Sequence, residues 1–374
     1  MRVLICPNAF KGCLTSIEAA AAIHQGIRDS GHEGIVLPLA DGGDGTLETL
    51  VNATGGEIVT SEVTGSLGGR VAARWGKLGG GKSGTAVIEM AEAAGLRLLR
   101  PEEYNPLVTT TYGVGELIKL AVEAGCREIL VGIGGSATND GGAGMAQALG
   151  ARLLDDMGEP LSYGGYELRR LHSIDRTQWS LLPDVTVTVA CDVNSPLLGR
   201  DGASRVFGPQ KGATPEMVEM LESSLSHYAD FLDRLSNRKV SECPGAGAAG
   251  GLGAGLMAFC NATLKNGIDF VLDSLNFGEL CNRSDIVLTG EGKIDDQTIR
   301  GKVISGVLRR STVPVIAITG SLTVEGELSM YENGLTAAFS LCDMPMELEE
   351  ALVNARVLLR RAAERVGRML SLTA

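Results

Sequence analysis

The stretch VLICPNAFKGCLTS, residues 3–16, decides how the chain begins to fold. Its apolar start, residues 3–6, ends at Pro7, which is typical of a buried strand in a parallel sheet. Thr15 or Ser16 can then cap a helix whose apolar residues share one face. The apolar residues that follow this helix return as a second strand. This order of strand, helix and strand predicts a βαβ unit at the start of the chain.

The end of the chain shows the same alternation, whereas the middle has a different pattern. Three more apolar strands are expected near the end, at residues 285–288, 315–318 and 335–341. They precede a final helix with one apolar stripe. In the middle, three adjacent strands joined by Gly-rich turns come before a helix and a further strand. These strands are expected at residues 58–63, 71–78 and 85–90.

The two patterns predict an α/β protein with two unlike domains. Residues 1–55 and 285–374 are expected to form a parallel-sheet domain of Rossmann or flavodoxin-like type. Residues 56–284 are expected to form a mixed-sheet α/β domain that interrupts the first one.

The composition is that of a folded globular protein, and it argues against several functional classes. Hydrophobic residues make up 44% of the 374 residues and charged residues 21%. The net charge of −12 argues against a nucleic-acid or anionic-membrane surface. The eight Cys are scattered without CxxC pairs and only four His are present, so no zinc site or disulfide framework is predicted. The chain starts with a strand rather than a signal peptide, and a cytoplasmic location is expected.

Three Gly-rich motifs match nucleotide-binding sequence patterns, but the elements predicted around them do not support nucleotide binding. GKLGGGKS at 76–83 matches the P-loop pattern, but strands are expected on both sides, so a hairpin turn is the preferred interpretation. GAGAAG at 245–250 follows Pro244, which favours a Gly/Ala helix start packed closely on a neighbour. GIGGSA at 132–137 does follow a strand, but no acidic residue ends a second strand about 20 residues later. Support for NAD binding is therefore weak.

Gly-rich polar loops after the predicted strands carry the groups that phosphoryl transfer needs. That reaction requires donors for the phosphates, carboxylates for Mg²⁺ and a base or orienting group for the hydroxyl. Lys11, between the first strand and the first helix, is placed to meet a carboxylate or a phosphate. Asp41 and Asp44 lie among glycines after the second strand and suit a hard cation, which prefers oxygen ligands. The alternative for this loop is a tight turn with a helix cap at Asp44.

Later loops add further candidates of the same kinds. The loop 134–144 leads from a strand into a short Gly/Ala helix, and its successive N–H groups are expected to bind phosphate. The loop 290–302 offers the oxygens of Glu291 and Asp295. Asp192, at the end of another strand, is a reasonable general base.

Six sequence blocks, in this order, resemble the bacterial type I glycerate kinase family along essentially the whole chain. They lie at residues 10–12, 40–46, 134–144, 208–213, 245–253 and 290–302. The resemblance implies ATP- and Mg²⁺-dependent phosphorylation of D-glycerate, usually giving 2-phosphoglycerate and ADP. It also implies two unlike α/β domains, one inserted in the other, with the active site in the cleft between them. The chain departs from the family where Asn8-Ala9 replaces Asp-Ser and where Ser195-Pro196 replaces Asn-Pro.

Together, the loops and the resemblance predict a set of site residues. Lys11, Lys211 and Arg300 are expected to bind glycerate, and Asp41, Asp44 and Glu291 to bind Mg²⁺. Asp192 or Asp295 is expected to take or orient the proton of the attacking hydroxyl, and Lys11 is counted with the catalytic residues. The ATP phosphates are expected to contact Gly134, Gly135, Ser136, Thr138, Asn139, Gly141, Gly142 and Lys302.

Two alternatives stay open at this point. The first is an NAD-dependent oxidoreductase that acts on a small hydroxy acid, and the second is a non-catalytic ligand-binding regulator. The expected partners are D-glycerate and ATP, without nucleic acid or membrane. The sequence leaves open the oligomeric state and the choice between the C2 and C3 hydroxyl groups.

Overall fold

The computed structural model describes residues 1–43, 45–179, 183–295 and 303–372. The chain divides into two compact units: Met1–Asp41 together with Asn266–Ala374, and Gly42–Lys265. The second unit is thus inserted between two segments of the first. Three of the predicted site residues, Asp44, Arg300 and Lys302, lie outside the described residues.

The first unit contains a five-stranded sheet in which each neighbouring pair of strands is parallel. Along the sheet the order is β13-β12-β11-β1-β2, which in chain order within the unit is the flavodoxin-like arrangement 5-4-3-1-2. The predicted parallel-sheet fold class is therefore confirmed. The strands are β1 (Arg2–Pro7), β2 (Glu33–Val36), β11 (Ile286–Ile294), β12 (Val315–Leu322) and β13 (Ala337–Ser340).

The order of the strands creates a topological switch point between β1 and β11. The chain leaves β1 towards β2 on one side, whereas it leaves β11 towards β12 and β13 on the other side. The loops after β1 and β11 therefore diverge from adjacent strand ends. Open α/β sheets bind their ligands outside such carboxyl ends.

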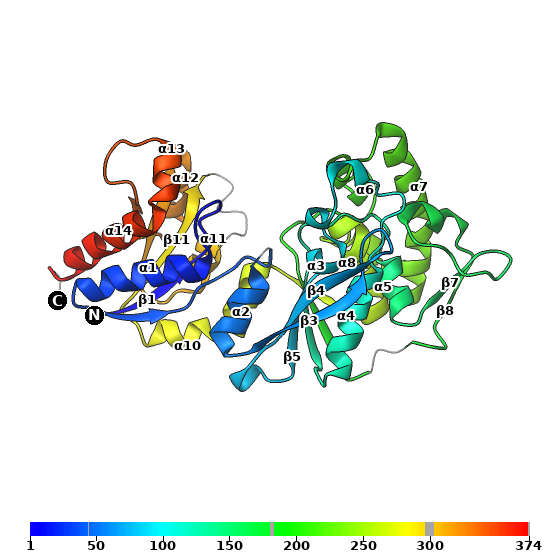
Figure 1. The fold of residues 1–374 in the computed structure, drawn as a ribbon, viewed down its shortest axis with the longest axis horizontal. Helices are drawn as coiled ribbons and strands as arrows, with labels where there is room; N and C mark the ends of the chain where they lie inside the picture. The colour runs from blue at the N-terminus through cyan, green and yellow to red at the C-terminus, as the bar shows by residue number, and fades with distance from the viewer. Residues whose placement is uncertain (44, 180–182, 296–302, 373–374) are drawn as a thin grey trace. The chain divides into compact units, whose positions relative to one another are not determined.

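Helices pack around this sheet. α1 and α14 lie side by side (Figure 1) and share one buried cluster with Val3 and Ile5 of β1. α11 packs against β11, and its Gly306 lies directly on Ile268 of α9. The helices of this unit are α1 (Ser16–Asp29), α9 (Gly267–Ser274), α10 (Phe277–Asn282), α11 (Val303–Arg310), α12 (Val324–Glu332), α13 (Leu348–Val353) and α14 (Ala355–Leu370).

The second unit has a mixed six-stranded sheet in the order β10-β9-β6-β5-β4-β3. The pairs β3–β4 and β4–β5 are antiparallel and the other pairs are parallel, as expected for a meander followed by α/β connections. Its strands are β3 (Glu57–Thr64), β4 (Arg70–Lys77), β5 (Thr85–Glu89), β6 (Glu128–Gly132), β9 (Thr186–Ala190) and β10 (Thr263–Lys265), and a separate hairpin pairs β7 (Arg152–Leu154) with β8 (Ser173–Asp175). Its helices are α2 (Thr46–Thr54), α3 (Ala91–Ala94), α4 (Tyr112–Glu123), α5 (Ala143–Ala148), α6 (Ala203–Phe207), α7 (Pro215–Ser236) and α8 (Ala248–Cys260).

The boundaries between the two units lie at 41/42 and 265/266, whereas the sequence predicted them at 55/56 and 284/285. α2 belongs to the second unit, because its Leu47 and Val51 side chains pack on Gly76 of β4 and the Leu47 N–H donates to Glu89. α9 and α10 belong to the first unit, where α9 packs against α11. The predicted boundaries were wrong because the partners of these helices are remote in sequence.

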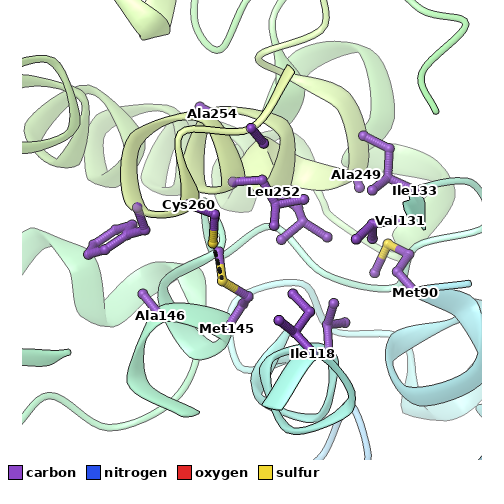
Figure 2. Packing of buried hydrophobic residues seen from close by; sticks show 14 of the residues in the cluster. Met90, Ile118, Val131, Ile133, Met145, Ala146, Ala249, Leu252, Ala254 and Cys260 are labelled. Carbon is purple, nitrogen blue, oxygen red and sulfur yellow. Dashed lines mark hydrogen bonds between the residues drawn. The ribbon is translucent and has the colours of Figure 1, made fainter. Parts of the chain in front are cut away.

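The core of the second unit is built around α8, in which every residue is buried. Figure 2 shows Leu252 of this helix directed towards the part of the cluster that contains Val131 of β6 and Ile118 of α4. Gly250 of the motif 245–250 lies against the carbonyl oxygen of Thr138, an approach that a side chain would block. The motif at 245–250 therefore serves close packing, as its preferred interpretation predicted. Within the described residues, none of the helices is long and apolar enough to cross a lipid bilayer.

The packing of α1 on α14 generates a stability prediction. A Cβ at Gly26 of α1 would overlap the backbone carbonyl oxygen of Arg360 in α14. We expect Gly26→Ala to lower the free energy of unfolding by about 1–3 kcal/mol, since overpacking forces the helices apart. Gly278→Ala in α10 is the matched control, because a Cβ there meets nothing within 4 Å. This control should be neutral or stabilising by up to about 1 kcal/mol. Equal urea midpoints for the two variants would contradict the predicted helix contact.

Candidate active site

A cavity of about 310 Å³ lies within the first unit at the carboxyl ends of its strands. Its polar wall comes from residues at the ends of β1, β2, β11 and β12. These residues are Asn8, Lys11, Asp41, Glu291, Lys293 and Ser321. Three of the residues that the sequence predicted to act on phosphate, carboxylate or metal, namely Lys11, Asp41 and Glu291, therefore line one cavity.

The loop after β1 holds Lys11 at the tip of a closed turn. Phe10 is only 2% exposed and anchors the turn, and its N–H group and carbonyl oxygen both bond to Leu14 at 2.9 and 3.0 Å. Gly12 follows with φ of +85°, a left-handed conformation that glycine adopts without strain. Thr15 then caps α1 in a capping box with Glu18. The Lys11 side chain is consequently exposed at the cavity while the backbone on both sides is fixed.

Glycines at the ends of β11 and β12 hold Glu291 at the same cavity. A Cβ at Gly290 would overlap the carbonyl oxygen of Ile318, and one at Gly320 would overlap that of Gly292. The two strands therefore approach closely on both sides of Glu291, which is 6% exposed. Asn8 ties this end of β11 to the loop after β1, because its N–H donates to the Gly290 carbonyl oxygen at 2.8 Å.

The carboxylates of Asp41 and Glu291 form a donor set that fits Mg²⁺. Magnesium prefers oxygen ligands, and it commonly takes one or two carboxylates, with water and substrate phosphates completing its shell. In the described part of the chain no cluster of three or more His, Cys, Asp or Glu side chains could hold a metal ion. Asp41 and Glu291 both line the cavity and could hold such an ion together with a phosphate.

Sequence reasoning did not assign a role to Lys293 or Ser321, although both line the cavity. They occupy paired positions in the register of β11 and β12. Lys293 lies two residues after Glu291, so alternation along the strand would have been the signal for it. Its Nζ lies 3.2 Å from a carboxylate oxygen of Asp295, which is not among the residues that line the cavity.

In the second unit, most of the predicted phosphate loop faces the protein interior. Gly134 and Gly135 are exposed, whereas Ser136, Thr138, Asn139, Gly141 and Gly142 are buried. The buried carboxylate of Asp140 accepts hydrogen bonds from the N–H groups of Gly142 and Gly144 at 3.0 and 3.2 Å. It also accepts hydrogen bonds from the N–H and hydroxyl groups of Thr111. The N–H groups of Gly142 and Gly144 at the start of α5 therefore already donate to Asp140. Of the loop residues predicted to contact the ATP phosphates, Gly134 and Gly135 are the exposed ones.

Lys211 is also directed inward, which argues against the predicted contact with glycerate. The side chain is 1% exposed, and its Nζ donates to the Ser136 hydroxyl at 2.7 Å and to the Thr138 carbonyl oxygen at 2.6 Å. It thus ties the loop after β6 to the segment that precedes α7. Burial lowers the pKa of Lys211 to about 7, although the charge of Asp140 opposes this shift.

The remaining sequence candidates are placed as follows. The residues 76–83 form the connection between the antiparallel strands β4 and β5, so the hairpin interpretation is confirmed and a P-loop is excluded. Asp192 is exposed just after the end of β9.

The buried amine of Lys211 generates a prediction about pH. Its pKa is about 7 in the folded protein and near 10.5 in the unfolded chain, so between these values the unfolded chain binds more protons. The free energy of unfolding should therefore rise with pH in this window. Relative to Lys211→Met, which lacks the titrating group, the wild type should gain up to about 1.4 kcal/mol per pH unit.

The control for this experiment is Lys239→Met in the same unit, where the side chain is 70% exposed and pairs with Asp233. Urea unfolding of the three proteins at several pH values from 7 to 10 measures the effect. A difference between wild type and Lys211→Met that does not change with pH would contradict the buried position of this amine.

Comparison with known proteins agrees with the likeness described for the sequence. A model of the glycerate kinase family matches residues 3–371. The chain is 46% identical to a glycerate kinase from Bacillus subtilis (strain 168), with 100% of this chain and 98% of that protein covered. It is 45% identical to a glycerate 2-kinase from Escherichia coli (strain K12), with the same coverage.

A solved structure shows the same fold. The crystal structure of a protein from Salmonella typhimurium LT2, assigned as glycerate kinase 2, superimposes with a TM-score of 0.90 and 48% identity. The match covers 100% of this chain and 99% of the other. Together with the family match, these relatives establish that the chain belongs to the glycerate kinase family and is a kinase that phosphorylates glycerate.

Proposed function

We propose that the chain transfers the γ-phosphoryl group of ATP, with Mg²⁺, to the 2-hydroxyl of D-glycerate. The observation that carries this proposal is the gathering of Lys11, Asp41 and Glu291 around one cavity at the switch point of the first unit. A cation beside two carboxylates supplies an anion site and a metal site next to each other, which phosphoryl transfer requires. The choice of the 2-hydroxyl is supported by the relative from Escherichia coli, which is named glycerate 2-kinase.

In the proposed mechanism, the fixed turn after β1 presents the Lys11 ammonium to the carboxylate of glycerate. The carboxylates of Asp41 and Glu291 would hold Mg²⁺. The bound ion would neutralise the charge that develops on the transferred phosphoryl group. Because Glu291 is held between closely packed glycine backbones, its oxygens need little reorganisation to reach this geometry.

The base or orienting group for the hydroxyl is proposed to be Asp192 or Asp295. Asp295 is paired with Lys293 in the first unit, and Asp192 is exposed after β9 in the second. A positioned general base accounts for about 10²–10⁴ in rate. The expectation that groups from both units meet in a cleft stays a prediction, as do the ATP donor and the cytoplasmic location.

One incubation tests the reaction itself. D-Glycerate, ATP and Mg²⁺ are mixed with the protein and the product is identified by ³¹P and ¹³C NMR. Formation of 2-phosphoglycerate and ADP is expected. Formation of 3-phosphoglycerate would reject the proposed position of transfer, and glycerate phosphorylation with another donor but not with ATP would reject the proposed nucleotide.

Replacing the candidate bases tests their role. We expect Asp192→Asn to lower kcat at least about a hundredfold, because the amide cannot accept the hydroxyl proton. Asp295→Asn is the matched comparison, and only the residue that serves as base should cause such a loss. Near-normal turnover in Asp192→Asn would reject that residue and leave Asp295 as the candidate.

Replacing Glu291 tests the metal site. Glu291→Gln keeps the shape of the side chain but removes its charge, so half-maximal activity should require at least about tenfold more Mg²⁺. Glu279→Gln on α10 is the control, because this exposed carboxylate does not line the cavity. An unchanged Mg²⁺ dependence in Glu291→Gln would show that the ion is held elsewhere.

A further inference from the structure

The cavity in the first unit has a second wall that is apolar and that the reaction with glycerate leaves unexplained. This wall is built by Phe10 from the turn after β1, by Leu341 after β13, and by residues of α13 and α14. The helix residues are Leu348, Ala351, Leu352 and Ala355. Leu348 is 71% exposed at the cavity and Leu352 is half-buried, so apolar surface there is left without a partner.

Glycerate is a poor match for such a wall. The molecule carries an oxygen on every carbon, and burying hydroxyl or carboxylate oxygens against apolar side chains costs free energy unless hydrogen bonds replace those to water. The cavity volume of about 310 Å³ also falls at the lower end of the roughly 300–1,000 Å³ typical of pockets that enclose larger organic ligands. The apolar wall therefore calls for a ligand with a flat, weakly hydrated part.

We infer that this cavity binds the nucleoside end of the phosphoryl donor, an inference that rests on the proposed function. The base would lie against the apolar wall of α13 and α14, where Leu352 and the exposed Leu348 would cover its faces. The phosphates would extend towards the polar wall, which is lined by Lys293, Asp41 and Glu291 and by Lys11, the residue proposed to hold glycerate. This direction agrees with the sheet. Open α/β folds bind phosphates at the topological switch point, which in this unit lies between β1 and β11.

The inward-facing loop of the second unit supports the same assignment. Its N–H groups at Gly142 and Gly144 are occupied by Asp140, and its Ser136 and Thr138 are occupied by Lys211. The loop was predicted to contact the ATP phosphates together with Lys302, and of its predicted residues only Gly134 and Gly135 are exposed. The cavity of the first unit is lined by the cations Lys11 and Lys293 and by the apolar surface that a nucleotide requires.

Two cysteines of the cavity provide a direct test that does not depend on turnover. Cys13 and Cys342 are both half-buried and line the cavity, whereas Cys243 is half-buried in the second unit. The rate at which N-ethylmaleimide alkylates each thiol is measured by peptide mass spectrometry. The measurement is made without ligand and in the presence of ADP, adenosine or D-glycerate. We expect ADP and adenosine to slow modification of Cys13 and Cys342 by at least about fivefold, with Cys243 unchanged. D-Glycerate, which would reach only the Lys11 end of the cavity, should protect both thiols less than ADP does.

A pair of neighbouring variants on α13 gives a second measurement. Leu352→Gln places an amide in the apolar wall and should raise the KM for ATP about tenfold or more, with the KM for glycerate little changed. Val353→Gln is the control, because Val353 is 85% exposed and does not line the cavity.

The outcomes separate this inference from the proposed function. Equal protection by D-glycerate and ADP, or a higher KM for glycerate rather than ATP in Leu352→Gln, would assign the cavity to the acid and overturn the inference. Absence of protection by ADP at concentrations that saturate turnover would also overturn it, while the NMR product would still establish the kinase reaction. If the product experiment fails but ADP protects both thiols, the nucleotide site stands and the proposed reaction falls.

Discussion

The pairing of β1 with β11 is the interaction on which the rest of the molecule depends. It joins Val3 to Ile286 in parallel register and so links the two chain segments of the first unit, which the second unit separates in sequence. Within the ladder the Thr289 hydroxyl also donates to the Cys6 carbonyl oxygen, and just beyond it the Asn8 N–H donates to the Gly290 carbonyl oxygen. Because these two strand ends are adjacent, the turn that carries Lys11 and the glycines that hold Glu291 border one cavity. Backbone pairing thus brings the candidate site residues Lys11 and Glu291 to one cavity.

Much of this unit could be predicted from the sequence, since each of its strands is a short apolar run followed by a polar Gly-rich loop. Parallel strands place all such loops at one edge, so Lys11, Asp41 and Glu291 were expected near each other, and the cavity contains all three. The apolar wall was not expected. Leu348 and Leu352 belong to a regular stripe, which in a sequence is indistinguishable from an ordinary core-facing helix surface.

The second unit shows where such reasoning fails. Residues 134–144 have the glycines, hydroxyls and amide typical of a phosphate loop, yet the same composition also suits a segment packed against other backbones. Which of the two occurs is decided by residues remote in sequence: Gly250 lies on the Thr138 carbonyl oxygen, Tyr228 lies on Gly141, and Lys211 enters from the segment before α7. Two fixed acceptors of the loop, the Ser136 hydroxyl and the Thr138 carbonyl oxygen, replace water around the Lys211 ammonium. Such a buried cation is costly by itself, and its hydrogen bonds offset part of that cost by fixing one loop conformation.

The insertion of the second unit also has a consequence for how the protein is made. The last residue of β2, Val36, and the first of β11, Ile286, are separated by about 250 residues. At ribosomal rates of roughly 5–20 residues per second, the two strands are synthesised about 12–50 s apart. During that interval the nascent chain displays β1, whose residues Val3 to Cys6 are wholly buried in the finished protein. The inserted unit, by contrast, is a continuous segment that can complete its own core first. In the emerging polypeptide, β1 therefore lacks one of its two neighbouring strands until β11 leaves the exit tunnel.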